Sequence, residues 1–290
     1  MDHLGNDLTP VLVTGASGYL GARVLAILGT SGIDAVGTSR SAGHGLMECD
    51  LCDDSAVARL MDMVRPRSVI HCAARVPRDA AGYADPVLAS ANSRMLDGLL
   101  ENRPRRFVFP SSMTVYPHGI GLARERDALA TGPGYASAKL SMESRLLEDR
   151  SMDVAILRLP GLFGPPRRGG VLFNAAIAFA RNADFQLRQP VPQWSGLHID
   201  DAASSMVKAL SLPGGHHVMN VGYPGRMAIP DALERLARLF GRIWNWSSAV
   251  TWFELDLSRS LRLLGQTGSD FQSRLRQLAD WARGTARASP

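Results

Sequence analysis

The stretch that decides the fold reads Val11-Leu-Val-Thr-Gly15-Ala-Ser-Gly18-Tyr-Leu-Gly21. Its apolar start predicts a buried strand, and apolar residues then recur at helical spacing from Leu20 to Leu28. A strand, a glycine-rich turn and a helix in this order form a unit that binds dinucleotides. The glycines let the backbone approach the diphosphate, and the positive end of the helix attracts it. The spacing Gly-x-x-Gly-x-x-Gly is one residue wider than the commoner form of this motif. The alternative interpretation is a plain turn between strand and helix.

Around this unit, short apolar runs alternate with helical patterns through the first half of the chain. We predict strands at Val11–Thr14, Ala35–Thr38, Leu46–Cys49, Ser68–Cys72, Phe107–Pro110 and Val154–Leu159. We predict helices between them at Tyr19–Gly29, Ser55–Val64, Val87–Glu101 and Tyr135–Asp149. This order predicts an α/β fold of the Rossmann type, in which helices cover both faces of a doubly wound parallel sheet. Ligands of such sheets bind at the carboxyl ends of the strands.

The alternation of predicted strands and helices is interrupted at Pro160–Gly170, where prolines and glycines break regular structure and indicate a loop between lobes. Further elements are predicted at Phe173–Ala180 (helix), Asp200–Leu210 (helix), Val218–Val221 (strand) and Phe271–Arg283 (helix). We therefore predict a small, mainly helical C-terminal lobe that closes over the sheet edge. The expected division is a dinucleotide-binding domain at residues 1–160 and 197–221 and a substrate-binding lobe at 161–196 and 222–290.

Composition is typical of a globular enzyme, with 46% apolar and 20% charged residues in 290. The net charge of +5 is modest and the arginines are scattered, so we expect no nucleic-acid partner. The N-terminus lacks the pattern of a signal peptide. The longest apolar stretch, Gly170–Ala180, is too short to cross a bilayer, so we expect no membrane association.

The three cysteines are an odd, small number, which is typical of reduced thiols in a cytoplasmic protein. Cys49 and Cys52 have the spacing of a redox or zinc pair. No second cysteine pair accompanies them, and they follow a predicted strand. We therefore expect no metal site.

Only two of the 32 basic residues are lysines, and one of them, Lys139, follows Tyr135 by four positions. On a helix these two side chains share a face. The ammonium should then favour the ionised phenol and lower its pKa from about 10. A tyrosine tuned in this way can exchange a proton with an alcohol or a carbonyl.

With these pieces in order, the chain resembles the extended short-chain dehydrogenase/reductase family, the group of NAD-dependent epimerases and dehydratases. The matching motifs, in family order, are Thr14-Gly15-x-x-Gly18-x-x-Gly21, Asp50-Leu51, His71-Cys-Ala-Ala74, Asn92, Ser111-Ser112-x-x-Val115-Tyr116, Tyr135-x-x-x-Lys139-x-x-x-Glu143, Arg158-Leu-Pro160 with Gly164-Pro165, His198-Ile-Asp200-Asp201 and Leu255-Asp256-x-Ser258. The resemblance covers nearly the whole chain.

The resemblance implies which residues carry the reaction. Tyr135 takes the position of the family's acid and base, and Lys139 that of its partner, which also holds the nicotinamide ribose. Ser112 takes the position of the hydroxyl that hydrogen-bonds the reacting oxygen, where a donor stabilises developing negative charge. The implied cofactor-binding residues are Gly15, Ser17, Gly18, Tyr19, Leu20, Ser39, Arg40, Asp50, Leu51, Ala73, Ala74, Asn92, Tyr135, Lys139 and Pro160.

Some of these positions carry a more specific implication. Asp50 would accept a hydrogen bond from the adenine amino group, and Leu51 would pack on the ring. Asn92 would help to seat the cofactor, or would simply bond the backbone from inside its helix. His198 and Asp200 are interpreted as structural rather than catalytic.

The end of the second predicted strand departs from the family pattern. NAD-dependent members usually carry an acidic residue there, whereas this chain has Ser39-Arg40. An arginine beside small hydroxyls can bind the 2′-phosphate of NADP, and no carboxylate is present to repel it. We therefore expect NADP as cofactor, with NAD as the alternative. Arg40 would in that case stack on adenine or lie in solvent.

The predicted substrate-binding residues also differ from the family pattern. Sugar-nucleotide enzymes of the family often carry an arginine, which grips the substrate diphosphate, where this chain has Trp194. This weakens, without excluding, a nucleotide-sugar substrate, for which Arg167 or Arg168 would supply the charge; solvation of both is the alternative. The candidate substrate-binding residues are Ser112, Tyr135, Asn174, Trp194 and Arg167. The Asp-Glu pair that dehydratases place after their Ser/Thr is absent, so we do not expect dehydration.

We therefore expect an NADP-preferring epimerase or reductase that acts on a secondary alcohol or ketone, with a nucleotide-linked sugar as the favoured substrate and a homodimer as the oligomeric state. Two alternatives remain. One is a reductase of a non-nucleotide ketone or aldehyde. The other is a cofactor-sensing binding protein without turnover, which would not need Ser112, Tyr135 and Lys139 together.

Overall fold

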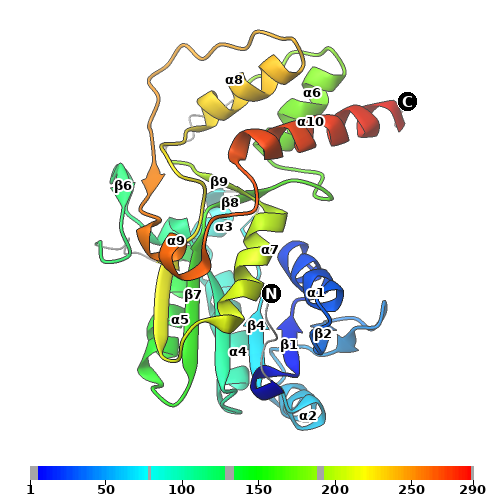
Figure 1. The fold of residues 1–290 in the computed structure, drawn as a ribbon, viewed down its shortest axis with the longest axis vertical. Coiled ribbons are helices and arrows are strands. Elements are labelled where there is room, and N and C mark those ends of the chain that lie inside the picture. The colour runs from blue at the N-terminus through cyan, green and yellow to red at the C-terminus, as the bar shows by residue number, and fades with distance from the viewer. Residues whose placement is uncertain (1–5, 78–79, 128–133, 188–192, 289–290) are drawn as a thin grey trace.

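The computed structural model describes residues 6–77, 80–127, 134–187 and 193–288, and its centre is one parallel sheet of seven strands (Figure 1). The strands are β1 (Val11–Thr14), β2 (Ala35–Ser39), β3 (Met47–Glu48), β4 (Ser68–His71), β5 (Arg106–Ser112), β7 (Asp153–Leu159) and β10 (His216–Asn220). Their order across the sheet is β10-β7-β5-β4-β1-β2-β3. The chain thus winds outward in both directions from β1, and the predicted doubly wound α/β fold is confirmed.

Helices cover both faces of this sheet. On one face lie α1 (Tyr19–Thr30) and α7 (Ile199–Lys208), and on the other lie α2 (Asp54–Val64), α4 (Pro86–Leu100) and α5 (Tyr135–Glu148). Within β1, Val11 and Val13 pack in the first core and Leu12 in the second. Strands buried on both faces need apolar residues at every position, which explains the continuous apolar runs.

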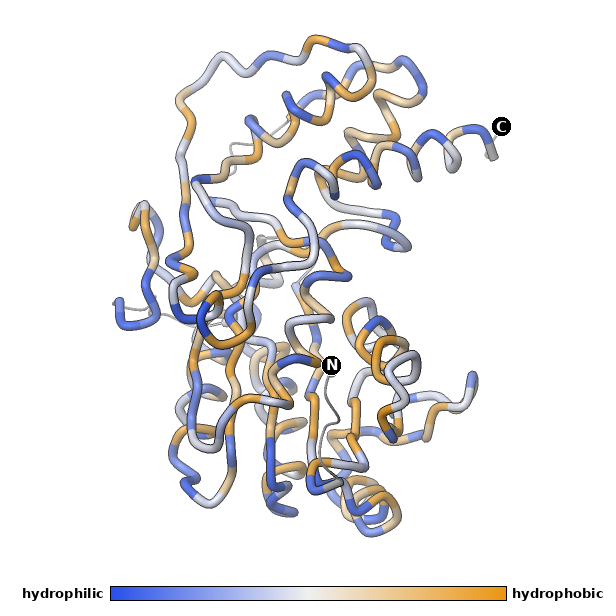
Figure 2. Tube along the Cα trace, in the orientation of Figure 1, coloured by the Kyte–Doolittle hydropathy of each residue, from blue (hydrophilic) through white to orange (hydrophobic). Residues whose placement is uncertain are grey.

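A group of helices lies beyond the carboxyl ends of the strands: α6 (Val171–Ala180), α8 (Ile229–Leu239) and α10 (Phe271–Ala288) (Figure 1). Their buried residues belong to the same apolar cluster as those of α1 and α7. Along α8, hydrophobic and hydrophilic residues alternate with the helical turn, as expected for a helix with one buried face (Figure 2). The chain then runs through 240–253 to β11 (Glu254–Leu255) and α9 (Ser258–Leu264).

Several short elements escaped prediction: α3 (Ala80–Ala84), the 3-10 helix η2 (Met113–Val115), and the strands β6 (Leu122–Ala123), β8 (Gly161–Phe163) and β9 (Gly196–His198). Strand β8 pairs with β9, and β6 pairs with β11. Two or three residues are too few to show an alternating pattern. All strands of the large sheet fall within 1–160 and 197–221, while the division into two functional domains stays a prediction. None of the described helices is long and apolar enough to cross a membrane.

Candidate active site and cofactor pocket

The glycine turn between β1 and α1 leaves no room for a side chain at two of its glycines. Gly15 has φ +64°, and a Cβ there would lie 2.7 Å from the Cα of Ala73. A Cβ on Gly21 would collide with the carbonyl oxygen of Gly15. Helix α1 begins after Gly18 without a side-chain cap, so its first backbone N–H groups have no side-chain acceptor. A close backbone approach and an uncapped helix start fit a bound diphosphate.

Beside this turn lies a cavity of about 200 Å³. It brings together these residues from the predicted cofactor set: Gly15, Ser17, Gly18, Ser39, Arg40, Asp50, Leu51, Ala73 and Ala74. Sequence reasoning missed the remaining lining residues, which are Thr38, Cys49, Cys52, Cys72, Arg75 and Met95. Thr38, Cys49 and Cys72 are the last residues of predicted strands, and that position was the available signal. The cavity joins the ends of β1, β2, β3 and β4, as expected for a ligand at the switch point of a doubly wound sheet.

The end of β2 presents Arg40 to this cavity. Its side chain is exposed and forms no hydrogen bond or ion pair with the residues that the structure describes. The neighbouring Ser39 is buried, and its hydroxyl donates to the carbonyl oxygen of Ser41. Across the cavity, the Asp50 carboxylate is exposed and accepts from the backbone N–H of Cys52 at 2.9 Å. Within the described part of the chain, Arg40 is therefore an unpaired cation at the rim of a pocket.

The loop after β4 forms another wall and is held from two sides. Asn92, buried in α4, accepts from the N–H of Arg75 at 2.7 Å and donates to its carbonyl oxygen at 3.0 Å. On the other side, the Thr14 hydroxyl accepts from the N–H of Ala73 at 3.3 Å and shares a 2.8 Å hydrogen bond with Nδ1 of His71. Asn92 thus bonds backbone, and in doing so it shapes the Ala73–Arg75 wall of the cavity.

The three candidate catalytic residues are placed near the carboxyl end of β5, and Lys139 Nζ lies 5.8 Å from the ring centroid of Tyr135. Ser112 is the last residue of that strand, and its Oγ accepts hydrogen bonds from the backbone N–H (3.2 Å) and the hydroxyl (3.0 Å) of Thr114. Tyr135 is the first residue of α5. One helical turn later, Lys139 Nζ donates to the carbonyl oxygen of Pro110 at 2.8 Å, which fastens α5 to β5 two residues before Ser112.

The expected lowering of the Tyr135 pKa is wrong for this structure. Burial raises the pKa of the Tyr135 phenol, and Tyr83, whose ring meets it edge-to-face at 5.8 Å, raises the pKa further. The Lys139 nitrogen bonds Pro110 and lies 4.4 Å from the ring centroid of Phe109, so it does not compensate. Burial outweighs the ammonium here, and Tyr135 is a neutral phenol that can donate a proton.

Lys139 is itself perturbed by its surroundings. Burial lowers the pKa of Lys139 to about 8, although Cys72 and Glu143 act in the opposite direction. Burial of His71 and the charge of Lys139 lower the pKa of His71 to about 3. The imidazole of His71 is therefore neutral. Among Tyr135, His71 and Lys139, the group that carries charge near neutral pH is therefore Lys139.

Under the site lies a buried ion pair between α5 and β7. The guanidinium of Arg158 donates to both carboxylate oxygens of Glu143, at 3.1 Å and 2.7 Å, and also to Tyr116 Oη at 3.0 Å. Both charged side chains are 4% exposed. Tyr116 in turn donates to Asn220 Oδ1 at 2.6 Å, which reaches the edge strand β10. These motif residues hold α5, β7 and β10 together rather than face a ligand.

On the substrate side, the Trp194 indole packs on the β8–β9 pair. A Cβ on Gly161 would lie 3.0 Å from its Nε1, and one on Gly196 would lie 2.5 Å from its six-membered ring. Its ring centroid is 6.3 Å from that of Phe271 on α10. Of the other candidates on this side, Asn174 is exposed on α6 and Pro160 is buried between β7 and β8.

The start of α1 contacts this side through Tyr19. Its hydroxyl donates to the carbonyl oxygen of Gly164 at 2.6 Å, and the guanidinium carbon of Arg167 lies 5.7 Å from its ring centroid. Leu20, the next residue of the predicted cofactor set, is partly buried against the core of this face. Arg167 is thus placed at the start of α1 and not beside Trp194 in any contact that the structure describes.

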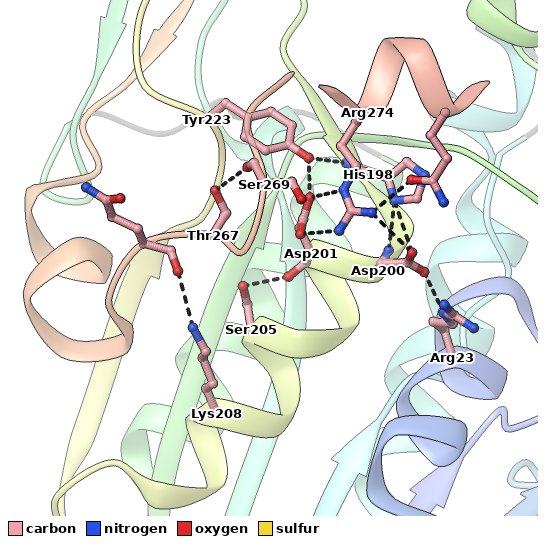
Figure 3. A network of polar contacts seen from close by, with 12 residues as sticks. Arg23, His198, Asp200, Asp201, Ser205, Lys208, Tyr223, Thr267, Ser269 and Arg274 are labelled. Atoms are coloured by element: carbon pink, nitrogen blue, oxygen red, sulfur yellow. Dashed lines mark hydrogen bonds and ion pairs between the residues drawn. The ribbon is translucent and has the colours of Figure 1, made fainter. Parts of the chain in front are cut away.

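A second polar network joins α1, α7 and α10 (Figure 3). Arg274 of α10 donates to both oxygens of Asp201, at 2.8 Å and 2.7 Å, and lies 3.4 Å from Asp200. Arg23 of α1 pairs with Asp200 at 2.5 Å, and Tyr223 donates to Asp201. His198 is 1% exposed, and burial and Arg274 lower its pKa to about 4. These contacts match the structural roles predicted for His198 and Asp200.

Comparison with known proteins identifies the family. The sequence model of the NAD dependent epimerase/dehydratase family matches residues 11–222. The chain belongs to this family. Protein YeeZ of Escherichia coli K12 is 29% identical over 198 residues, which are 67% of this chain and 66% of that protein. Methionine adenosyltransferase 2 subunit beta of Danio rerio is 29% identical over 53% of this chain and 48% of its own length. This member of the epimerase/dehydratase family therefore spans about two thirds and about half of the two relatives.

Solved structures share the fold over almost the whole chain. UDP-glucose 4-epimerase of Thermotoga maritima, solved with UDP-glucose, superposes with a TM-score of 0.81 at 18% identity and covers 95% of this chain and 99% of its own. UDP-glucose 4-epimerase of Thermus thermophilus, solved with NAD, gives a TM-score of 0.77 at 22% identity, with 94% and 99% covered. At this identity the likeness shows the fold of the epimerase/dehydratase family.

Proposed function

We propose that this protein is an NADP-preferring epimerase or reductase that acts on a secondary alcohol or ketone of a nucleotide-linked sugar. The observation that carries the proposal is the placement of Ser112 at the end of β5, with Lys139 and Tyr135 of α5 fastened to that strand through Pro110, at the same sheet edge as the glycine turn and its cavity. A binding protein would need the cavity but not this trio.

The cofactor would occupy the cavity and the start of α1. Asp50 would accept from the adenine amino group, Leu51 would pack on the ring, and Arg40 with Ser39 would bind the 2′-phosphate. Tyr135 and Lys139 would hold the nicotinamide ribose. A bound nicotinamide would supply the hydride chemistry at the substrate carbon.

The proton is handled by the protein. In the reducing direction, the neutral Tyr135 phenol gives its proton to the substrate carbonyl oxygen, and in the oxidising direction the phenolate takes it back. The Ser112 hydroxyl, which accepts two hydrogen bonds from Thr114, keeps its own hydrogen free to donate to the same oxygen. Lys139, held by the Pro110 carbonyl oxygen, is the charged group that would bind the nicotinamide ribose beside Tyr135.

The nucleotide-sugar assignment is supported by fold neighbours that were solved with UDP-glucose. Its test is a titration of UDP, GDP and dTDP against the NADPH-loaded protein, followed by assays of sugar epimerisation and of net NADPH consumption. An epimerase would retain the cofactor, and a reductase would consume NADPH stoichiometrically. If no nucleotide binds at millimolar concentration while a simple ketone is reduced, the substrate is a non-nucleotide ketone or aldehyde.

The cofactor choice has its own test. NADP should bind on the order of ten- to a hundred-fold more tightly than NAD, since a charge-assisted hydrogen bond contributes about 1.5–3 kcal/mol. Arg40→Ala should remove most of this preference. Equal affinities in the wild type, or tighter binding of NAD, would assign NAD as the cofactor.

We further propose a cytoplasmic homodimer. The three free thiols support a reducing compartment. Val87 at the start of α4 is 69% exposed and Val76 is 59% exposed, which supports a contact with a second copy near this helix. Analytical ultracentrifugation of the wild type and of Val87→Asp tests the dimer, because the variant should be monomeric.

A further inference from the structure

Arg167 has no acidic partner among the described residues. It lies in the loop between β8 and α6, its side chain is exposed, and none of the described carboxylates forms an ion pair with it. Its guanidinium sits over the ring of Tyr19, with the central carbon 5.7 Å from the ring centroid. The only hydrogen bond described for it is a long one, 3.5 Å from Nη1 to the carbonyl oxygen of Leu162. Most of its donors are therefore unused within the described structure.

Tyr19 holds this loop against the start of α1. It is the first residue of that helix, directly after Gly18, and its hydroxyl donates to the carbonyl oxygen of Gly164 at 2.6 Å. Burial raises the pKa of Tyr19, so the phenol stays protonated and the hydrogen bond persists at neutral pH. Arg167 follows Gly164 by three residues, and the phenol therefore fixes the stretch that carries it.

The charges around this point favour an anion. Helix α1 starts without a side-chain cap after Gly18, so its positive end is at Tyr19. Arg167 lies over the ring of this same residue. Asp200 is the acidic residue whose charge helps to raise the pKa of Tyr19. It is paired with Arg23 at 2.5 Å and lies 3.4 Å from Arg274. Tyr19 thus joins an arginine over its ring to a helix N-terminus at its backbone, and the charge of Asp200 is neutralised by its own partners.

We propose that Arg167 binds the diphosphate of the dinucleotide cofactor, not that of a sugar-nucleotide substrate, and so closes the β8–α6 loop over the glycine turn. This inference rests on the proposed function, because it requires a dinucleotide at α1. A guanidinium can reach two diphosphate oxygens at once, which a lysine cannot match.

The test compares ligands with and without a diphosphate. Calorimetry would measure NADPH and adenosine 2′-monophosphate on the wild type, Arg167→Ala, Arg168→Ala and Arg40→Ala, and UDP on the NADPH-loaded forms. Arg168 is the matched control, since it is the adjacent exposed arginine and forms no hydrogen bond, ion pair or cation–π contact with the described residues. We expect Arg167→Ala to weaken NADPH on the order of ten-fold and to leave adenosine 2′-monophosphate unchanged. Arg40→Ala should weaken both ligands, and Arg168→Ala neither.

Each other outcome is decisive. Unchanged NADPH affinity in Arg167→Ala would overturn the inference and leave the proposed function standing. If Arg167→Ala lost UDP binding but kept its NADPH affinity, Arg167 would bind the substrate diphosphate, and the inference would be overturned. An equal loss in Arg168→Ala would show a general effect of charge and would also overturn the inference. If the wild type bound neither NADPH nor adenosine 2′-monophosphate, the proposed function itself would fail.

Discussion

At the scale of single residues, Tyr135 is the group on which turnover should depend most. Tyr135→Phe removes only the hydroxyl from a buried ring, so the fold and cofactor affinity should stay close to wild type. Turnover should fall by roughly 10²–10⁴, the usual contribution of a positioned acid or base. Steady-state kinetics beside a cofactor titration would check this. Turnover within a few-fold of the wild type would remove Tyr135 from the mechanism.

Lys139 makes stability depend on pH in a defined direction. Burial lowers its pKa from 10.5 to about 8, so unfolding takes up a proton between these two pH values. Relative to Lys139→Met, the free energy of unfolding of the wild type should therefore rise as pH increases from about 8 to 10.5. Urea titrations of both proteins at several pH values measure the difference. A difference that is flat or falls with pH would contradict a lowered pKa of Lys139 in the folded protein.

The same residue shows what sequence reasoning could not supply. The spacing of Tyr135 and Lys139 placed both side chains on one helix face, and α5 confirms that placement. It could not predict that the Pro110 carbonyl would take the ammonium, or that Tyr83 would pack on the phenol. The direction of a pKa shift depends on desolvation, which comes from contacts that are distant in sequence.

At the scale of elements, α5 depends on its buried ion pair with β7. Glu143→Ala would leave the Arg158 guanidinium without its carboxylate in a site that is 4% exposed. Loss of one partner of such a pair lowers the free energy of unfolding by about 3–5 kcal/mol. Chemical denaturation measures this, with Glu148→Ala as the control because Glu148 lies at the less buried end of the same helix. Similar small effects of both substitutions would show that the pair contributes little.

The strands and helices of the large sheet were predictable because both faces of the sheet are buried. Continuous apolar runs such as Val11–Thr14 follow directly from that burial. The cavity beside the glycine turn was predictable because the carboxyl ends of parallel strands lie at the same edge of a sheet. The pairs β6–β11 and β8–β9 were not, because they join residues far apart in the chain through two or three positions.

At the scale of the whole molecule, Arg274 ties the last helix to the rest. Its target, Asp201, has a side chain only 2% exposed, and Arg274→Ala would leave that carboxylate buried with Tyr223 as its remaining side-chain partner among the described residues (Figure 3). We expect a loss of about 3 kcal/mol or more in the free energy of unfolding. Thermal denaturation would check this, with the exposed Arg276 of the same helix as the control site. Equal melting temperatures for Arg274→Ala and Arg276→Ala would show that the Arg274–Asp201 ion pair does not stabilise the fold.

All three cysteines of the chain line the one cavity beside the glycine turn. Burial raises the pKa of Cys72 to about 12 and also raises the pKa of Cys49, which makes both thiols slow nucleophiles. Half-buried Cys52 should therefore be alkylated first by iodoacetamide, and NADPH should slow that reaction. Intact-mass spectrometry would measure the fraction of protein that carries one carbamidomethyl group, with and without NADPH. The protected fraction reports how much of the protein has dinucleotide in the cavity, and the substrate need not be known. Labelling that proceeds at the same rate with saturating NADPH would place the dinucleotide elsewhere.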